Sequence, residues 1–297
     1  MAVFAMNCLV SILNISVNST LIYLVFKLRL WGKPTFVFVV FMSISDVIIG
    51  LGPQSLVGYL ILVPGSGCRK IEILAQSLLH SLCEFSGLMI NLITIDRYLH
   101  IRFLNNYNRY MNRHKALVMV VVSVVICLLL AALSTVASIT NKLFQLQVVL
   151  MTINTCMLIA VCALYVICYY RIRNRTRALQ NLTTQGIRRN DLHLAIGILL
   201  IFVTLLICYL PNFVTMTIWL YQKYYIAGKQ KSVTTAILSY SFILVVLNSS
   251  LNALILMYTD RRIRTFLKSK ICRNCSTVHP GVHQYETRTP VIMISYR

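Results

Sequence analysis

Seven apolar segments divide this chain, and each is long enough to cross a bilayer, which takes about 20 residues in a helix. Lipid provides no hydrogen-bond partners for an open backbone, and the segments lack the alternation typical of strands, so each is predicted to be a helix. The expected fold class is therefore all-α, a bundle of seven transmembrane helices. The predicted helices cover residues 2–26, 35–61, 72–100, 115–138, 146–170, 191–221 and 233–259.

The composition excludes a soluble protein. Of the 297 residues, 58% are hydrophobic and 12% are charged, and a soluble domain could not hide that much apolar surface from water. The formal charge of +21 is also typical of proteins that bind nucleic acid. Here, however, Lys and Arg cluster at the ends of the apolar segments, where membrane topology and anionic lipid explain them better. Membrane lipid is therefore an expected partner, and nucleic acid is not.

The basic residues also predict the orientation of the chain, because cytoplasmic loops carry an excess of Lys and Arg. The excess lies after the first, third, fifth and seventh segments, so the N-terminus is predicted to be extracellular and the C-terminus cytoplasmic. The first segment is too long for a cleavable signal peptide and lacks a basic leader. The glycosylation sequons at Asn14 and Asn18 lie inside this segment and are discounted.

A short amphipathic helix is predicted after the seventh segment, at residues 260–271. Ile263, Phe266 and Leu267 share one face with Ile271, and basic residues occupy the rest, which suits a helix lying in the inner membrane interface. Residues 1–271 are therefore predicted to form one membrane domain, and residues 272–297 a disordered cytoplasmic tail. Cys272 and Cys275 directly follow this helix and are candidate lipidation sites, because palmitoyl chains attached there would reach lipid. Two unmodified thiols explain these cysteines equally well.

The tripeptide Asp96-Arg97-Tyr98 ends the third apolar segment. Charged residues within a membrane span are energetically costly and usually have a functional role. At this place in a chain of seven segments, the tripeptide resembles the signature of the rhodopsin-like (class A) G-protein-coupled receptors. The resemblance implies a plasma-membrane receptor that binds an extracellular ligand and passes the signal to a heterotrimeric G protein. It also implies that Asp191 is an acidic partner of Arg97, and that Tyr165 belongs to the same coupling site.

Polar residues inside the apolar segments extend the resemblance. Each would be costly alone against lipid, so they are expected to converge in the interior of the bundle. By the resemblance, Asp46 with Ser86 and Asn248 would hold a sodium ion or a water cluster; a hydrogen-bonded packing network without an ion explains them equally well. No other cofactor or metal is expected. The polar residues are Asn18, Asp46, Ser86, Asn248, Ser249 and Asn252.

Several positions depart from the family pattern. Pro211 matches the sixth-helix proline and is expected to form a hinge, but Tyr209 replaces the usual Trp before it. In the seventh segment, Ala253 and Leu256 replace the usual Pro and Tyr, which puts the standard activation switch in question. The second outer loop lacks a cysteine and Met157 replaces a proline, as in the melanocortin branch, to which the chain has a weak similarity.

The ligand is not expected to be a typical biogenic amine, because Leu79 stands where amine receptors carry an Asp. Glu84 is the most informative pocket candidate, since a carboxylate within a span needs a partner or a proton. His80 lies one helical turn away, so the two form either a structural pair or a recognition pair. The candidates for the outer pocket are Gln54, Glu72, Gln76, His80, Glu84, Tyr209, Asn212, Phe213 and Tyr240.

Two other functions compete with a signalling receptor. A small transporter or channel would use Asp46 and Glu84 as ion ligands, but the internal repeats typical of transporters are not visible in the sequence. A protein with the receptor fold that no longer signals would explain the departures in the seventh segment. An enzyme is not expected, because the chain contains no metalloprotease HExxH motif, no Gly-rich phosphate loop and no recognisable Ser-His-Asp grouping.

Overall fold

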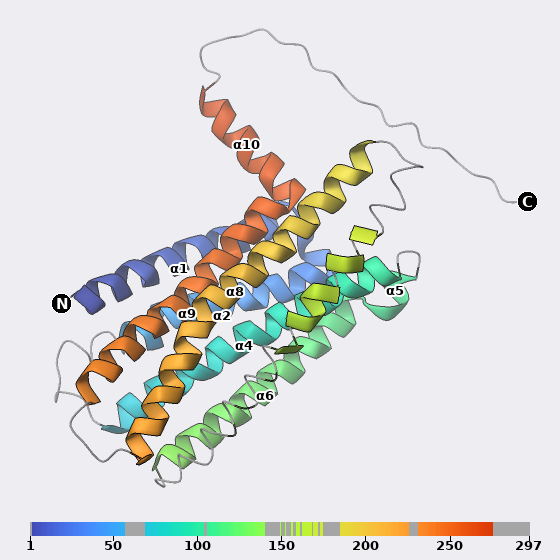
Figure 1. Ribbon diagram of the computed structural model, residues 1–297. Coiled ribbons are helices and arrows are strands. Elements are labelled where there is room, and N and C mark those ends of the chain that lie inside the picture. Colours follow the sequence, from blue (N-terminus) through green and yellow to red (C-terminus); the bar gives the residue numbers. More distant parts are fainter. Residues whose placement is uncertain are drawn as a thin grey trace, which may run out of the picture.

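The computed structural model consists of helices packed side by side (Figure 1). Within the residues that it describes, every regular element is helical. It describes residues 2–56, 69–103, 106–139, 149, 152, 156, 159–160, 162–167, 169–171, 173–174, 185–225 and 231–275. The elements are α1 (Ala2–Lys27), η1 (Leu30–Gly32), α2 (Pro34–Leu51), α4 (Arg69–Arg102), α5 (Tyr107–Tyr110), α6 (Arg113–Ile139), α8 (Gln185–Tyr225), α9 (Lys231–Thr259) and α10 (Arg261–Cys275).

These helices confirm the all-α class, and six of them correspond to predicted spans. Four of the described helices are by themselves long and apolar enough to cross a membrane, at Phe4–Lys27, Pro34–Leu56, Ile73–His100 and Arg113–Val136. In α8 the apolar stretch is shorter, at Val203–Ile218, and α8 begins six residues before the predicted start at 191. The predicted fifth span, 146–170, is described only in part, and about half of its residues lie outside the described ones.

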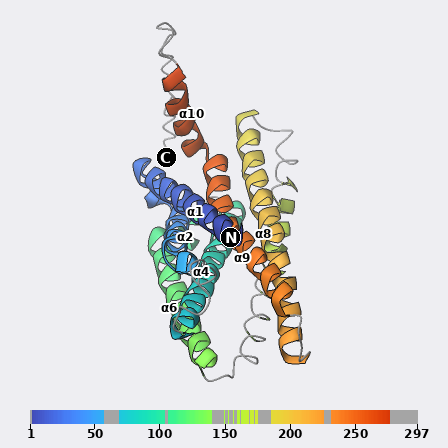
Figure 2. The same ribbon diagram turned by 90° about the vertical axis from the view of Figure 1, so that its left-hand side faces the viewer.

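Helix α2 is the centre of the packing. Two thirds of its apolar window (67%) is buried inside the protein, against 22% for α6, so α6 lies at the periphery and offers its apolar surface to lipid. α2 packs against α1, α4, α6 and α9, while α8 packs chiefly along α9. Figure 2 shows the α8–α9 pair beside the group formed by α1, α2, α4 and α6. The core between them contains Phe38 and Met42 of α2, Met89 of α4 and Ala253 of α9.

The amphipathic segment after the seventh span forms α10, which begins and ends slightly later than predicted. A sharp bend of 85° separates it from the last part of α9 (Figure 1). The Asp260 carboxylate caps its first turn by accepting hydrogen bonds from the backbone N–H groups of Arg262 (2.9 Å) and Ile263 (3.1 Å). The Ile263 side chain is fully buried in the core, with Phe266 packed against it. Tertiary packing of the apolar face therefore fixes the direction of α10.

Candidate functional site

Polar side chains of α1 form a ladder of hydrogen bonds to α2. Asn7, Ser11 and Asn14 follow each other at helical spacing and so lie on one face of α1. Ser11 and Asn14 donate to the backbone carbonyls of Gly50 (2.6 Å) and Asp46 (2.7 Å) of α2, and Asn7 donates to that of Gln54 (3.0 Å), which follows α2. The sequence analysis missed this ladder, although three polar residues at helical spacing in an apolar segment are a readable signal.

Gln54 belongs to this interface, and only 1% of its surface is exposed. Its side-chain amide donates to the backbone carbonyl of Asn7 (3.2 Å) and to the side-chain Oδ1 of Asn7 (3.1 Å). It was predicted to line an outer pocket. The structure instead places it between α1 and α2, because the polar face of α1 offers it partners that water would otherwise provide.

Asn14 supplies the first testable prediction. We expect Asn14→Leu to lower the free energy of unfolding by about 1–2 kcal/mol, since it removes a cross-helix hydrogen bond and leaves a second one unmade. Thermal denaturation of the purified protein in detergent measures the effect. The matched control is Ser16→Ala on the same helix, because the Ser16 hydroxyl donates to the Ile12 carbonyl of its own helix. Equal melting temperatures for the two variants would contradict the ladder.

The six polar residues predicted to converge are all buried in the bundle. The hydroxyls of Ser86 and Ser249 face the Asp46 carboxylate without completing hydrogen-bond geometry. Asn14 joins the group from α1: its Oδ1 accepts from Asn18 (2.8 Å) and from Ser250 of α9 (3.4 Å). Helices α1, α2, α4 and α9 therefore all contribute to one polar cluster.

Among the atoms of this polar cluster that lack a hydrogen-bond partner, acceptors outnumber donors. Several buried polar atoms of the cluster have no hydrogen-bond partner among the described residues. In folded proteins such atoms are usually satisfied by a bound water molecule or an ion. Oxygen atoms of carboxylate, hydroxyl and amide groups are the ligands that hard cations prefer. The unpartnered atoms of the cluster are Asp46 Oδ1 and Oδ2, Asn18 Oδ1, Asn248 Oδ1, and Asn252 Oδ1 and Nδ2, and Ser43 Oγ lacks a partner as well.

Asp96 of the tripeptide joins three elements. Its carboxylate is buried, with 1% of the residue exposed, and accepts hydrogen bonds from Thr35 of α2 and from Tyr107 of α5. Desolvation and the hydrogen bond to Asp96 raise the pKa of the Tyr107 phenol. Among the described residues, no ion pair joins Asp96 to Arg97. Two hydroxyl donors instead occupy the Asp96 carboxylate.

A match to a known protein family shows to which family the chain belongs. The family "7 transmembrane receptor (rhodopsin family)" matches residues 17–256. The chain belongs to this receptor family. A search of curated proteins finds no match. The family match confirms the resemblance on which the site residues were predicted, and the similarity to the melanocortin branch is not shown.

Tyr98, the last residue of the receptor's tripeptide, lies between two arginines. Arg102 donates from Nη1 to the Tyr98 hydroxyl (3.2 Å), and the Arg171 guanidinium lies over the Tyr98 ring, 5.2 Å from its centre. Arg171 directly follows the predicted fifth span, 146–170. Tyr165, from the same segment, is buried with 5% of its surface exposed. The third and fifth spans therefore contact each other at the tripeptide.

Positive charge gathers at this end of the receptor. Burial lowers the pKa of Lys33, and the nearby charges of Arg262 and Arg97 lower it further, while Asp260 raises it. Lys33 directly precedes α2, Arg97 lies on α4 and Arg262 lies in the first turn of α10, so cationic side chains from three parts of the chain lie near one another. The side chain of Asp191, the predicted partner of Arg97, lies outside the described part of the structure, as do the side chains of Cys272 and Cys275.

The residues predicted to line the outer pocket have different surroundings in the receptor. Tyr209 packs against the core, Asn212 and Phe213 are half-buried, and Tyr240 is exposed. Gln76, His80 and Glu84 all have interaction partners, and the Glu72 side chain lies outside the described residues. Leu79 is 3% exposed and packs with Ile49 of α2 and Val246 of α9. An apolar contact therefore occupies the position from which amine receptors bind an ammonium group.

Proposed function

We propose that this receptor transmits the binding of an extracellular ligand to a heterotrimeric G protein, with Arg97 as the central coupling residue. The observation that supports the proposal is the pair of hydrogen bonds accepted by the Asp96 carboxylate. The carboxylate is bound by Thr35 and Tyr107, so Arg97 is not neutralised by its own neighbour in the sequence. An arginine without that pair is able to engage a partner that enters the bundle from this end.

The proposed orientation follows from the charges. The end that carries Arg97 also carries Lys33 and Arg262, and an excess of basic residues marks the cytoplasmic side. The N-terminus is then extracellular and the C-terminus cytoplasmic, in the plasma membrane. At rest, Asp191 of α8 restrains Arg97. Activation moves the inner end of α8 away from α4 and opens a cavity for a helix of the G protein.

The polar cluster fits a bound cation or water molecules. Asp46, Ser86 and Asn248 would hold a sodium ion, which would neutralise the Asp46 carboxylate and give its oxygens the partners that they lack. The apolar contact of Leu79, Ile49 and Val246 lies beside this cluster, toward the predicted ligand side. We propose that the cluster couples α2, α4 and α9 during activation.

A second candidate function is a receptor fold that does not signal. The observation in its favour is α9, which is a continuous α-helix from Lys231 to Thr259. Ala253 stands in the place of the family proline and is fully buried in the core. Without that proline, α9 lacks the usual place at which it would bend. A transporter or channel is not supported, because the family to which the chain belongs consists of receptors.

Activation of a panel of G proteins in cells decides between the two functions. The full chain is expressed with and without a broad ligand library, and dissociation of each heterotrimer is recorded by energy transfer. Signalling receptors are expected to activate at least one G protein, either on their own or with a ligand. Silence across the panel at confirmed surface expression would favour the second function.

The contact between Tyr107 and Asp96 supplies a further prediction. We expect Tyr107→Phe to reduce G-protein activation by a few-fold. The Asp96 carboxylate would lose one hydrogen-bond donor and pair with Arg97 instead, so that Arg97 would no longer be available to the G protein. The control is Tyr110→Phe on the same short helix; Tyr110 is 46% exposed and stacks on Phe103, a contact that Phe preserves. Both activation and thermal stability are measured. If Tyr107→Phe matches its control in both measurements, the hydrogen bond has no role.

A further inference from the structure

Helices α8 and α9 are joined at two levels. After Pro211, the hydroxyls of Thr215 on α8 and Ser241 on α9 form a hydrogen bond of 2.8 Å, and Ser241 is buried. Before the proline, Gly197 of α8 lies so close to Thr259 of α9 that an added Cβ would meet the Thr259 Cγ2 at 2.5 Å. A hydrogen bond and a close steric contact therefore connect the two helices on either side of the proline.

The Thr215 hydroxyl is also held within its own helix. It lies 2.8 Å from the carbonyl oxygen of Pro211 and 3.2 Å from that of Asn212. Because a hydroxyl both donates and accepts, Thr215 can donate within α8 and accept from Ser241 at the same time. The bond to Ser241 therefore attaches α9 to the turn of α8 that contains the proline, which is where a helix usually bends.

The hydrogen bonds between α9 and the group formed by α1, α2, α4 and α6 are less complete. The described part of α8 packs chiefly along α9. In the polar cluster, Asn248 Oδ1 and both polar side-chain atoms of Asn252 are buried without a hydrogen-bond partner among the described residues. The bond from Ser250 of α9 to Asn14 of α1 is long, at 3.4 Å. A shift at this interface therefore breaks fewer hydrogen bonds than a separation of α8 from α9.

Helix α9 is also stiff enough to carry α8 with it. It is continuous from Lys231 to Thr259, and the buried Ala253 stands where the family has a proline, so α9 lacks the usual place to bend. Closely packed elements do not deform gradually, and they shift as units between discrete arrangements. Two helices joined at two levels, one of them without a bend, form such a unit.

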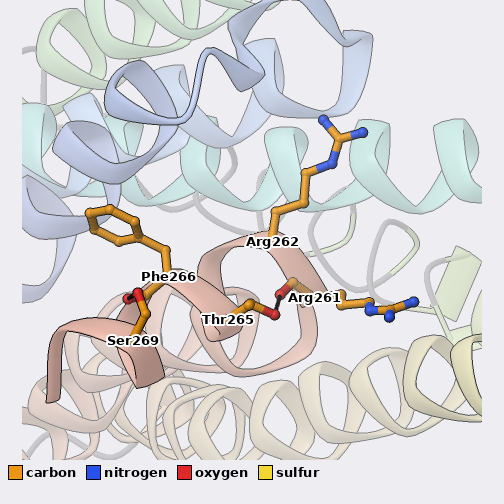
Figure 3. Close-up of a pocket in the computed structure, with 5 residues that line it drawn as sticks. All are labelled: Arg261, Arg262, Thr265, Phe266 and Ser269. Atoms are coloured by element: carbon orange, nitrogen blue, oxygen red, sulfur yellow. Dashed lines mark hydrogen bonds between the residues drawn. The ribbon is translucent and has the colours of Figure 1, made fainter. Parts of the chain in front are cut away.

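The junction between α9 and α10 gives this unit room at its inner end. α9 ends at Thr259 and α10 begins at Arg261, with a bend of 85° between the two helices. An open hollow of about 590 Å³ borders the first turns of α10, and Figure 3 shows Arg261 and Arg262 extending there in different directions. The angle between α9 and α10 can therefore change while Ile263 keeps α10 anchored in the core.

We propose that α8 and α9 move as one rigid pair when the receptor is activated, so that the inner end of α8 leaves α4 together with α9. The Thr215–Ser241 bond and the Gly197–Thr259 contact hold the pair together, and the polar cluster is the interface that shifts. This motion belongs to the activation step proposed above and rests on it. The distance between α8 and α9 is measured apart from signalling, however, so the two proposals can fail separately.

A disulfide between α8 and α9 tests the rigid pair in cells. In the Thr215→Cys/Ser241→Cys receptor, sulfur atoms replace two oxygens that lie 2.8 Å apart, so a small shift brings them to the disulfide length of about 2 Å. Mild oxidation closes the bridge, mass spectrometry of peptides verifies it, and a reducing agent opens it. The two single variants are the matched controls, because each loses the hydrogen bond and cannot form this bridge.

We expect the oxidised double variant to activate the G protein within about twofold of the single variants, since a bridge inside a rigid pair restricts no movement. A loss of about tenfold or more that reduction restores would overturn the proposal, because α8 would then have to separate from α9.

Pulsed electron paramagnetic resonance measures the pair in the purified full chain, whether or not the chain signals. Spin labels are placed two at a time on ketone-bearing amino acids, so that the native cysteines stay in place. They replace the exposed Leu200 of α8, Tyr258 of α9 and Val118 of α6. Gly197→Ala is the sensitivity control, because its methyl group should lengthen the distance between α8 and α9.

We expect a single α8–α9 distance that stays unchanged when the G protein binds, while the α8–α6 distance increases. A second α8–α9 distance, or one that changes with the G protein, would overturn the proposal. An unchanged α8–α6 distance in a signalling receptor would overturn it as well. A parent that activates no G protein would refute the proposed function alone, because the number of α8–α9 distances would still decide whether the pair is rigid.

Discussion

The Arg97→Ala receptor is expected to lose G-protein activation while it reaches the cell surface at near-normal levels. Arg97 is half-buried at the end of α4, and its neighbour Asp96 is bound elsewhere, by Thr35 and Tyr107. Removal of the guanidinium therefore leaves these contacts intact and removes only the group proposed to meet the G protein. The fold should tolerate the change, since no ion pair of Arg97 is present among the described residues.

The measurement is heterotrimer dissociation in cells, with surface expression recorded on the same cells. Arg109→Ala is the matched control, because it also removes one positive charge from this end of the receptor and Arg109 is exposed on α5. Asp191→Asn extends the test: it removes the proposed restraint and should raise ligand-independent activity by about fivefold, the effect of roughly 1 kcal/mol. Full activation by the Arg97→Ala receptor would refute the role of Arg97.

The largest effect on stability is expected from Gly197→Leu. Gly197 lies on α8 against Thr259 at the end of α9, and a Cβ atom at this position would meet the Thr259 Cγ2 at 2.5 Å and its Cβ at 2.9 Å. The Thr259 hydroxyl donates to the Ile255 carbonyl of its own helix (2.8 Å), which fixes the direction of the methyl group. A leucine therefore forces α8 and α9 apart, at a cost of about 1–3 kcal/mol or more.

Gly87 provides the control for this prediction. It is also a glycine inside a helix, α4, but a Cβ at Gly87 would meet no atom within 4 Å. Gly87→Ala should therefore raise stability slightly, by up to about 1 kcal/mol, because alanine favours the helix over the unfolded chain. Gly197→Ala should lower it. The comparison uses thermal denaturation in detergent, and a melting temperature of Gly197→Ala at or above the parent's would show that α8 and α9 do not approach each other this closely.

Much of the fold was readable from the sequence. Runs of apolar residues predicted six of the described helices, and the alternation of basic and apolar residues predicted α10 to within a few residues. The tripeptide at Asp96 and the polar residues inside the spans indicated the family, because charged and amide groups in lipid are too costly to occur without a use. Burial of Asp46, Asn248 and Asn252 confirms that these side chains face the interior.

The partners of these residues were not readable from the sequence. The donors to Asp96 come from Thr35, 61 positions away, and from Tyr107 on another helix. Gln54 was expected in a ligand pocket, but it bonds to Asn7, 47 positions away. The close approach of Gly197 to Thr259 likewise joins two separate helices.

The sequence by itself therefore determined the class of the protein, the number of spans and the residues too polar to face lipid. Tertiary structure decided which helix faces which and which donor each acid receives. The physical reason lies in the membrane: lipid and protein core are both apolar, so hydrophobicity reports that a segment is inserted and says little about its neighbours. Val124 on α6 is exposed, whereas Val39 on α2 is buried, and both stand in equally apolar runs.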